Sequence, residues 1–135
     1  MGNNNNAHSS AALAFLGDAV FGLMSREKIV NEHNCSAGQL HTLSVKAVNA
    51  AAQCRGAKKI LPLLSETERD VFMRGRNMHV NHTPKNQTEG DYHYATGLEA
   101  LFGYLYLEGK TDRLRELFDI ICNDCGALDS VEKEE

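Results

Sequence analysis

Apolar residues recur every three or four positions along most of the chain, which is the spacing of one face of an α-helix. No stretch alternates between apolar and polar residues with the period of a strand, so the sequence predicts an all-α fold. The predicted helices cover residues 9 or 10 to about 30–32, 37–54, 58–64, 66–75, 92–108 and 111–125.

Several helix ends are marked by their own residues. Ser9 or Ser10 is suited to cap the first helix, and Ser65 with Glu68 three positions later has the pattern of a capping box. Gly56 is expected to end the second helix, and Gly109 to end the fifth. Residues 76–90 contain asparagines, a proline and a glycine, and predict a long loop of the kind that is usually functional.

Composition limits the classes of protein to consider. With 135 residues, 42% of them apolar and 24% charged, the chain is expected to form one domain. No apolar run approaches the ~20 residues that span a bilayer, and the start lacks the pattern of an export signal, so we expect a cytoplasmic protein with reduced cysteines. We expect a disordered segment over residues 1–8, a folded domain over 9–126 and a disordered acidic tail over 127–135.

The charge is unevenly distributed. The chain has 14 Lys and Arg against 18 Asp and Glu, a net charge of −4, which argues against binding nucleic acid with the whole surface. Residues 69–88, however, carry Arg69, Arg74, Arg76 and Lys85 against Asp70 alone. A local basic loop of this kind is suited to contact phosphates.

Two carboxylates stand alone in apolar helices. Asp18 is the only charged residue within 13–24, and Glu99 is the only one within 95–107. Because such helices belong in a core or an interface, an ionised carboxylate there needs a hydrogen-bonding partner or a cation. Small neighbours around both acids would let the two helices approach closely, and two carboxylates together suit Mg²⁺ or Mn²⁺. A solvated seam or a distant arginine would explain the acids equally well.

Other metal sites are poorly supported by the sequence. Cys122 and Cys125 form a single C-x-x-C pair without the second pair that a zinc site needs. His79 and His82 lie in the predicted loop, where no helix aligns their rings. A carboxylate-bridged metal protein would need Glu-x-x-His pairs, and the sequence has none.

Several phrases resemble a known family. L-G-D-A-V at residues 16–20 resembles the signature of the ribonuclease III family, and E-A-L-F-G-Y-L-Y-L at 99–107 resembles its second acidic helix. Three further motifs resemble the short Mini-ribonuclease III subgroup of this family: R-G-R-N at 74–77, T-P-K-N at 83–86 and Y-A-T at 94–96. The resemblance extends from about residue 12 to 126, without a double-stranded-RNA-binding domain.

The resemblance implies a helical homodimer that cleaves double-stranded RNA with Mg²⁺, or Mn²⁺ as a substitute, and leaves 5′-phosphate ends. Asp18 and Glu99 would be the catalytic metal ligands. The subgroup's implied substrate is the precursor of 23S ribosomal RNA, and a ribosomal protein is a further implied partner. The alternative is a non-catalytic RNA-binding or ribosome-associated scaffold with the same fold, which would be expected to lose the acids.

The same resemblance assigns roles outside the two acids. Phe15, Leu16 and Phe21 are candidates for a seam between subunits. Ala14 and Thr96 stand where longer relatives have acids, and Gly22 stands where glutamate is usual. The candidate RNA contacts, each of which could instead be an ordinary solvated surface residue, are Arg74, Arg76, Asn77, Lys85, Asn86 and, with less support, Lys46.

Overall fold

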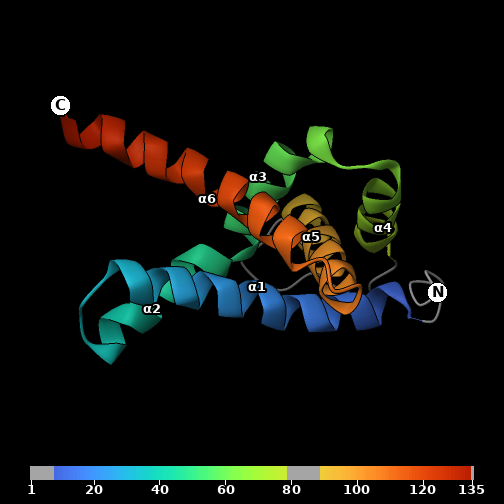
Figure 1. Ribbon diagram of the computed structural model, residues 1–135, viewed down its shortest axis with the longest axis horizontal. Coiled ribbons are helices and arrows are strands. Elements are labelled where there is room, and N and C mark those ends of the chain that lie inside the picture. Colours follow the sequence, from blue (N-terminus) through green and yellow to red (C-terminus); the bar gives the residue numbers. More distant parts are fainter. Residues whose placement is uncertain (1–7, 79–88, 135) are drawn as a thin grey trace.

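The computed structural model describes residues 8–78 and 89–134, and the side chains of residues 8–78 and 90–122. Its described part is helical and contains no strand, which confirms the all-α prediction. The elements are α1 (Ser10–Glu32), α2 (Ala37–Val48), α3 (Ala50–Ile60), the short 3₁₀ turn η2 (Leu61–Leu63), α4 (Glu66–Arg76), α5 (Glu89–Leu107) and α6 (Thr111–Glu134), shown in Figure 1. None of the described helices is both long and apolar enough to cross a membrane.

Helix α5 is the centre of the fold. It contacts α1, α3, α4 and α6, and its contact with α1 is the most extensive in the molecule. Leu98, Leu101, Phe102 and Leu105 on α5 are completely buried. In Figure 1, α1 runs along one long side of the molecule and α2 turns back against its C-terminal end. The apolar run of α5 is therefore explained by partners on several sides.

The helix ends predicted from Ser9, Ser65 with Glu68, and Gly109 are confirmed. The Ser9 Oγ accepts a hydrogen bond from the Ala12 N–H at 3.0 Å. Ser65 and Glu68 form a reciprocal capping box at the start of α4. Gly109 follows α5 with a φ of 73°, a conformation that glycine adopts without strain.

The predicted continuous helix over 37–54 is wrong. The chain leaves the helical conformation at Asn49 (φ −72°, ψ 164°), whose side-chain Oδ1 caps α3 by accepting from the Ala52 N–H at 2.8 Å. Gly56, the expected helix breaker, lies inside α3, and a Cβ there would come within 2.8 Å of the Ile121 side chain. Because Gly56 has no side chain, α3 can pack closely against Ile121 of α6. The predicted 58–64 helix is divided between the end of α3 and η2.

The last two helices also differ from their predicted limits. Helix α5 begins at Glu89, three positions before the predicted start at 92, and α6 continues to Glu134, beyond the predicted end at Cys125. Of the predicted 76–90 loop, residues 79–88 lie outside the described part of the chain, as do residues 1–7.

A partly buried ion pair fastens α6 to α4. The Arg113 guanidinium donates to both carboxylate oxygens of Glu68, at 2.8 Å each, and to the Leu63 carbonyl at 3.1 Å. The hydrogen bonds that the Glu68 carboxylate accepts from Arg113, and to a smaller extent from the Ser65 N–H, lower the pKa of Glu68. Glu68 thus caps α4 and anchors α6 with the same carboxylate.

Helices α1 and α5 cross with their backbones in contact. A Cβ on Gly17 would lie 1.6 Å from the Glu99 carbonyl oxygen, and one on Gly103 would lie 2.1 Å from the Leu13 carbonyl oxygen. Neither position has room for any side chain, because the opposing atoms belong to the backbone. The close approach expected from the small residues around both acids is confirmed.

We expect Gly103→Ala to destabilise the protein by about 3 kcal/mol or more, because the methyl group would force α1 away from α5. Gly38→Ala is the matched control: Gly38 is exposed, and its added Cβ would meet nothing closer than the Ser36 Oγ at 4.0 Å. Alanine there should be neutral or stabilising by up to about 1 kcal/mol. Urea unfolding of both variants measures the difference, and equal free energies of unfolding would contradict the close crossing.

Candidate active site

The two isolated acids lie together at the crossing of α1 and α5. Asp18 follows Gly17, the residue that packs against the backbone of Glu99. The two carboxyl groups are close enough to hydrogen-bond and to repel each other when both are charged. Residues 81 positions apart are thus brought to one site by a glycine contact.

The structure gives the two acids different surroundings, and Asp18 has the solvated position that the sequence left open. Its side chain is exposed, whereas Glu99 is half-buried. The difference follows from the crossing: Gly17 faces α5 directly, so Asp18, the next residue along α1, stands at the edge of the contact. No distant arginine pairs with either acid in the described part of the chain.

A buried amide from a third helix completes the site. Gln53 on α3 is 3% exposed, and its Nε2 donates to the Glu99 Oε2 at 3.3 Å. Sequence reasoning missed this residue, although Gln53 occupies the same helix face as the buried Ala50, Cys54 and Ala57. A polar residue in the middle of such a face is a signal that could have identified it. The adjoining pocket of about 200 Å³ is lined by Val48, Asn49, Ala50, Gln53, Tyr92, Ala95, Thr96 and Glu99.

Glu99 holds its proton more tightly than an ordinary glutamate. Burial, together with the neighbouring Asp18 carboxylate, raises the pKa of Glu99 to about 7, against the opposing effect of the Gln53 hydrogen bond. The site therefore resists carrying two negative charges at once, because no described protein cation neutralises them. A cation at this position would relieve both the burial cost and the repulsion.

The donor set fits a magnesium-like ion that keeps most of its water. Mg²⁺ binds through one or two carboxylates, and Asp18 and Glu99 supply two hard oxygen ligands. Among the described residues no group of three or more His, Cys, Asp or Glu side chains could form a fuller cage. Ala14 and Thr96, one turn before the two acids, are buried, and the Thr96 hydroxyl donates to the Tyr92 carbonyl at 2.9 Å. Neither of them adds a carboxylate.

The candidate RNA contacts that the structure describes are divided between two places. Arg74 is exposed near the end of α4 and pairs with Asp70, with 3.1 Å between Nε and Oδ2. Arg76 hydrogen-bonds Asn77, the C-cap residue of α4. Lys46 is exposed in the last turn of α2 and lines a different pocket. Lys85 and Asn86 lie outside the described residues.

Two cationic side chains lie against the Tyr94 ring, an arrangement that the sequence did not predict. The guanidinium of Arg76 lies 5.2 Å from the centre of the Tyr94 ring, and the Lys58 Nζ lies 5.3 Å from it. The tyrosine also packs edge-on against Phe72, with 6.0 Å between ring centres. Tyr94 therefore holds two cations from α3 and α4 near the N-terminal half of α5. No spacing rule in the sequence places Lys58 beside Arg76.

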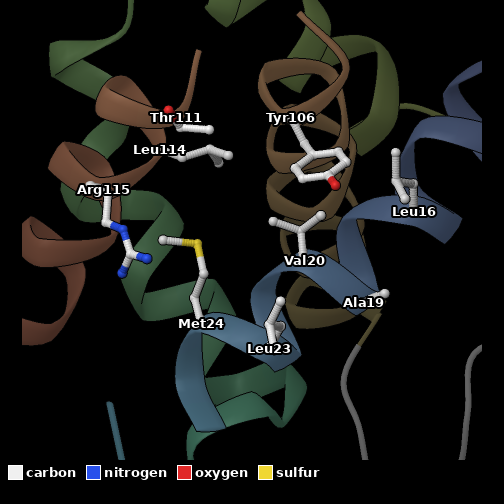
Figure 2. A pocket seen from close by; sticks show the side chains of 9 residues that line it. All are labelled: Leu16, Ala19, Val20, Leu23, Met24, Tyr106, Thr111, Leu114 and Arg115. Atoms are coloured by element: carbon white, nitrogen blue, oxygen red, sulfur yellow. The ribbon is translucent and has the colours of Figure 1, made fainter. Parts of the chain in front are cut away.

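An apolar pocket of about 290 Å³ opens between α1, α5 and α6. Figure 2 shows Tyr106 of α5 lying over Val20 of α1, with Leu16, Ala19, Leu23, Met24, Thr111, Leu114 and Arg115 around them. On α1, Phe15 is 84% exposed and Leu23 is 69% exposed. Phe21, by contrast, is 3% exposed and packs against Phe102 and Phe118. Its expected place in a subunit seam is therefore wrong, because its ring belongs to the core.

The raised pKa of Glu99 predicts a stability that falls as pH rises. Between about pH 4.5 and 7 the unfolded chain ionises Glu99 while the folded chain retains the proton, so the free energy of unfolding decreases over that window. In EDTA, Glu99→Gln should be more stable than the original protein at pH 8, by about 2–3 kcal/mol, and the difference should vanish towards pH 4.5. Urea unfolding across this range measures it, and parallel pH profiles would contradict the shift.

Comparison with known proteins gives a consistent match. The family model for the ribonuclease III domain matches residues 11–110. Mini-ribonuclease 3 of Thermoanaerobacter sp. is 49% identical over 83% of this chain and 79% of its own. Mini-ribonuclease 3 of Symbiobacterium thermophilum is 39% identical over 78% of this chain and 81% of its own.

Structural similarity extends the match to the fold. An X-ray structure of a Fusobacterium nucleatum protein superposes with a TM-score of 0.80 at 30% identity, covering 87% of this chain and 93% of that one. The matched region contains both acids and the crossing that joins them. The chain belongs to the ribonuclease III family of double-stranded-RNA endoribonucleases, and within it to the Mini-ribonuclease 3 group.

Proposed function

We propose that the protein hydrolyses double-stranded RNA with Mg²⁺ held by Asp18 and Glu99, and that Mn²⁺ can substitute. The observation that carries this proposal is the pair of carboxylates at the α1–α5 crossing, one exposed and one half-buried, with no cation paired to them among the described residues. When bound, the ion would neutralise charge on the scissile phosphate and make water a stronger nucleophile. The non-catalytic scaffold predicts loss of the acids, and both are present.

Residues around the two acids would hold the carboxylates in position. Gln53 orients the Glu99 carboxylate through its Nε2, and the backbone contact at Gly17 fixes the separation of the two acids. Asp18, being exposed, is the more accessible of the two proposed ligands. As the resemblance implies, the attacking water would form a new P–O bond while the P–O3′ bond breaks, which leaves a 5′-phosphate and a 3′-hydroxyl end.

RNA contacts would come from the basic end of α4 and the segment after it. Arg74 and Arg76, with Asn77, Lys85 and Asn86, are the candidates for phosphate and ribose contacts, and Lys46 is a further one on α2. A-form RNA is recognised mostly through phosphates and 2′-hydroxyl groups, to which these side chains can hydrogen-bond. The Arg76 guanidinium is already ordered on Tyr94, which lowers the entropic cost of a contact.

The cellular substrate we propose is the precursor of 23S ribosomal RNA, processed in the cytoplasm. This follows from the resemblance to Mini-ribonuclease III, in which a ribosomal protein is also an implied partner. A 100-residue match to the nuclease domain, together with 49% identity to a Mini-ribonuclease 3, supports transferring the role.

A homodimer would cover the apolar surface around the pocket of Figure 2. Phe15 and Leu23 on α1 are 84% and 69% exposed, and Tyr106 on α5 is 52% exposed. An exposed phenylalanine beside an apolar pocket is self-complementary in a two-fold arrangement, because each copy offers both the ring and the cavity. The dimer would place one pair of acids in each subunit, one for each RNA strand.

The catalytic assignment predicts that Asp18→Asn lowers Mg²⁺-dependent cleavage of long double-stranded RNA by orders of magnitude. The amide keeps the shape but removes the charge that holds the ion, so RNA should still bind. Glu99→Gln should behave alike, and the double variant should be little worse than either single one. Cleavage is followed with and without Mg²⁺, with sequencing of the product ends.

Asp112→Asn is the matched control, because Asp112 is an exposed acid in the first turn of α6. It should cleave like the original protein. Near-normal cleavage by the Asp18→Asn protein would overturn the assignment.

The dimer predicts a species of twice the 14.9 kDa chain mass in sedimentation at micromolar concentration. Phe15→Ser should shift the protein to monomer, because it removes an apolar ring from the seam. Val45→Ser serves as control, since Val45 is a 50% exposed apolar residue on α2 that does not line this pocket. A monomeric original protein, or a Phe15→Ser protein as dimeric as the control, would contradict the seam.

A further inference from the structure

A second pocket, lined by apolar side chains and by several cations, lies away from the candidate active site. It has a volume of about 290 Å³ and is lined by residues of α1, α2, α3 and α6. We call it the basic pocket, after the four cations in its lining: Lys28, Lys46, Arg55 and Lys59.

The basic pocket concentrates positive charge in an acidic protein. Its four cations face a single lining acid, Glu32, in a chain whose net charge is −4. Glu32 is paired with Lys28 one turn before it, and the Lys59 Nζ donates to the Ile121 carbonyl at 3.2 Å. In the described part of the chain neither Lys46 nor Arg55 forms an ion pair. Such a field favours an anion carrying more than one charge.

The floor of the basic pocket is apolar, with one hydroxyl in it. Phe118 and Ile121 of α6 and Ile29 of α1 line it. Ser25 lines the same pocket at 3% exposure, and its hydroxyl has no hydrogen-bond partner among the described residues. A buried hydroxyl without a partner is uncommon in folded proteins and indicates a group that is satisfied by something else.

The basic pocket faces away from both surfaces described above. On α3, Ala52, Arg55 and Lys59 occupy the face opposite Ala50 and Gln53, which line the pocket beside Glu99. On α1, Ser25 and Lys28 lie on the opposite face from Leu16 and Leu23, so the proposed dimer leaves the pocket open.

We propose that the basic pocket binds a nucleoside monophosphate, either free or as the terminal nucleotide of an RNA chain. The phosphate would contact Arg55 and Lys46, the flat base would cover Phe118 and Ile121, and a ribose or base group would hydrogen-bond Ser25. A volume of about 290 Å³ is at the lower end of the range for small-molecule sites, which suits one nucleotide. This site is independent of the proposed catalysis at Asp18 and Glu99.

Calorimetric titration of the full chain in EDTA tests the proposal with three probes: adenosine 5′-monophosphate, adenosine and inorganic phosphate. The monophosphate should bind at least about tenfold more tightly than either part, because it alone uses both the cations and the apolar floor. Its affinity should fall as the salt concentration rises.

Two pairs of variants locate the binding. Arg55→Gln should weaken monophosphate binding by about tenfold, since a charge-assisted contact is lost, whereas Lys110→Gln, at the turn before α6, should leave it unchanged. Ser25→Ala should weaken it severalfold without loss of thermal stability. Its control is Ser44→Ala, a 4% exposed serine on α2 that lines a different pocket.

A dinucleotide carrying a 5′-phosphate separates the two sources. Binding as tight as that of the monophosphate assigns the pocket to an RNA terminus, and binding at least about tenfold weaker assigns it to a free nucleotide. Inorganic phosphate binding as tightly as the monophosphate would overturn the proposal, as would unchanged binding in Arg55→Gln and Ser25→Ala. So would the absence of heat with millimolar monophosphate.

Discussion

The backbone contact between α1 and α5 is the constraint on which the rest of the molecule depends. Gly17 and Gly103 leave no room for a side chain, so the two helices meet at one register only. That register sets Asp18 beside Glu99 and leaves the apolar outer face of α1, with Phe15 and Leu23, uncovered. The proposed metal site and the proposed subunit seam are two consequences of one crossing.

The crossing also explains why the acids are unequal. Glu99 sits in the central helix beneath α1 and α3, where burial raises its pKa to about 7, while Asp18 stands in solvent at the edge. The folded protein tolerates the cost because Gln53 partly satisfies the carboxylate. The ionised Glu99 thereby lowers the free energy of unfolding near neutral pH. The same negative charge is what would bind a cation at this site. The ion pair between Arg113 of α6 and Glu68 of α4 stabilises a different part of the fold, away from the two acids.

The sequence predicted those features that depend on a few neighbouring residues. The Ser9 and Ser65 caps and the stop at Gly109 act within one turn, and each is confirmed. The break at Asn49 was missed although its signal is local, because Asn49 caps α3 through the Ala52 N–H three positions later. The packing role of Gly56 was mistaken because its neighbour Ile121 lies far along the chain. The exposure of Asp18, which the sequence left open, depends on the distant contact between Gly17 and Glu99. The pairing of Asp18 with Glu99 was anticipated from small neighbours and from resemblance, but Gln53 was not, because its hydrogen bond spans 46 positions.

The central claim is that Asp18 and Glu99 together hold a divalent metal ion. Titration of the protein with Mn²⁺, monitored through the electron paramagnetic resonance of the free ion, counts bound metal without reference to catalysis. We expect one site per chain that is lost in Asp18→Asn and in Glu99→Gln and retained in Asp112→Asn. Equal Mn²⁺ binding by all four proteins would contradict the account.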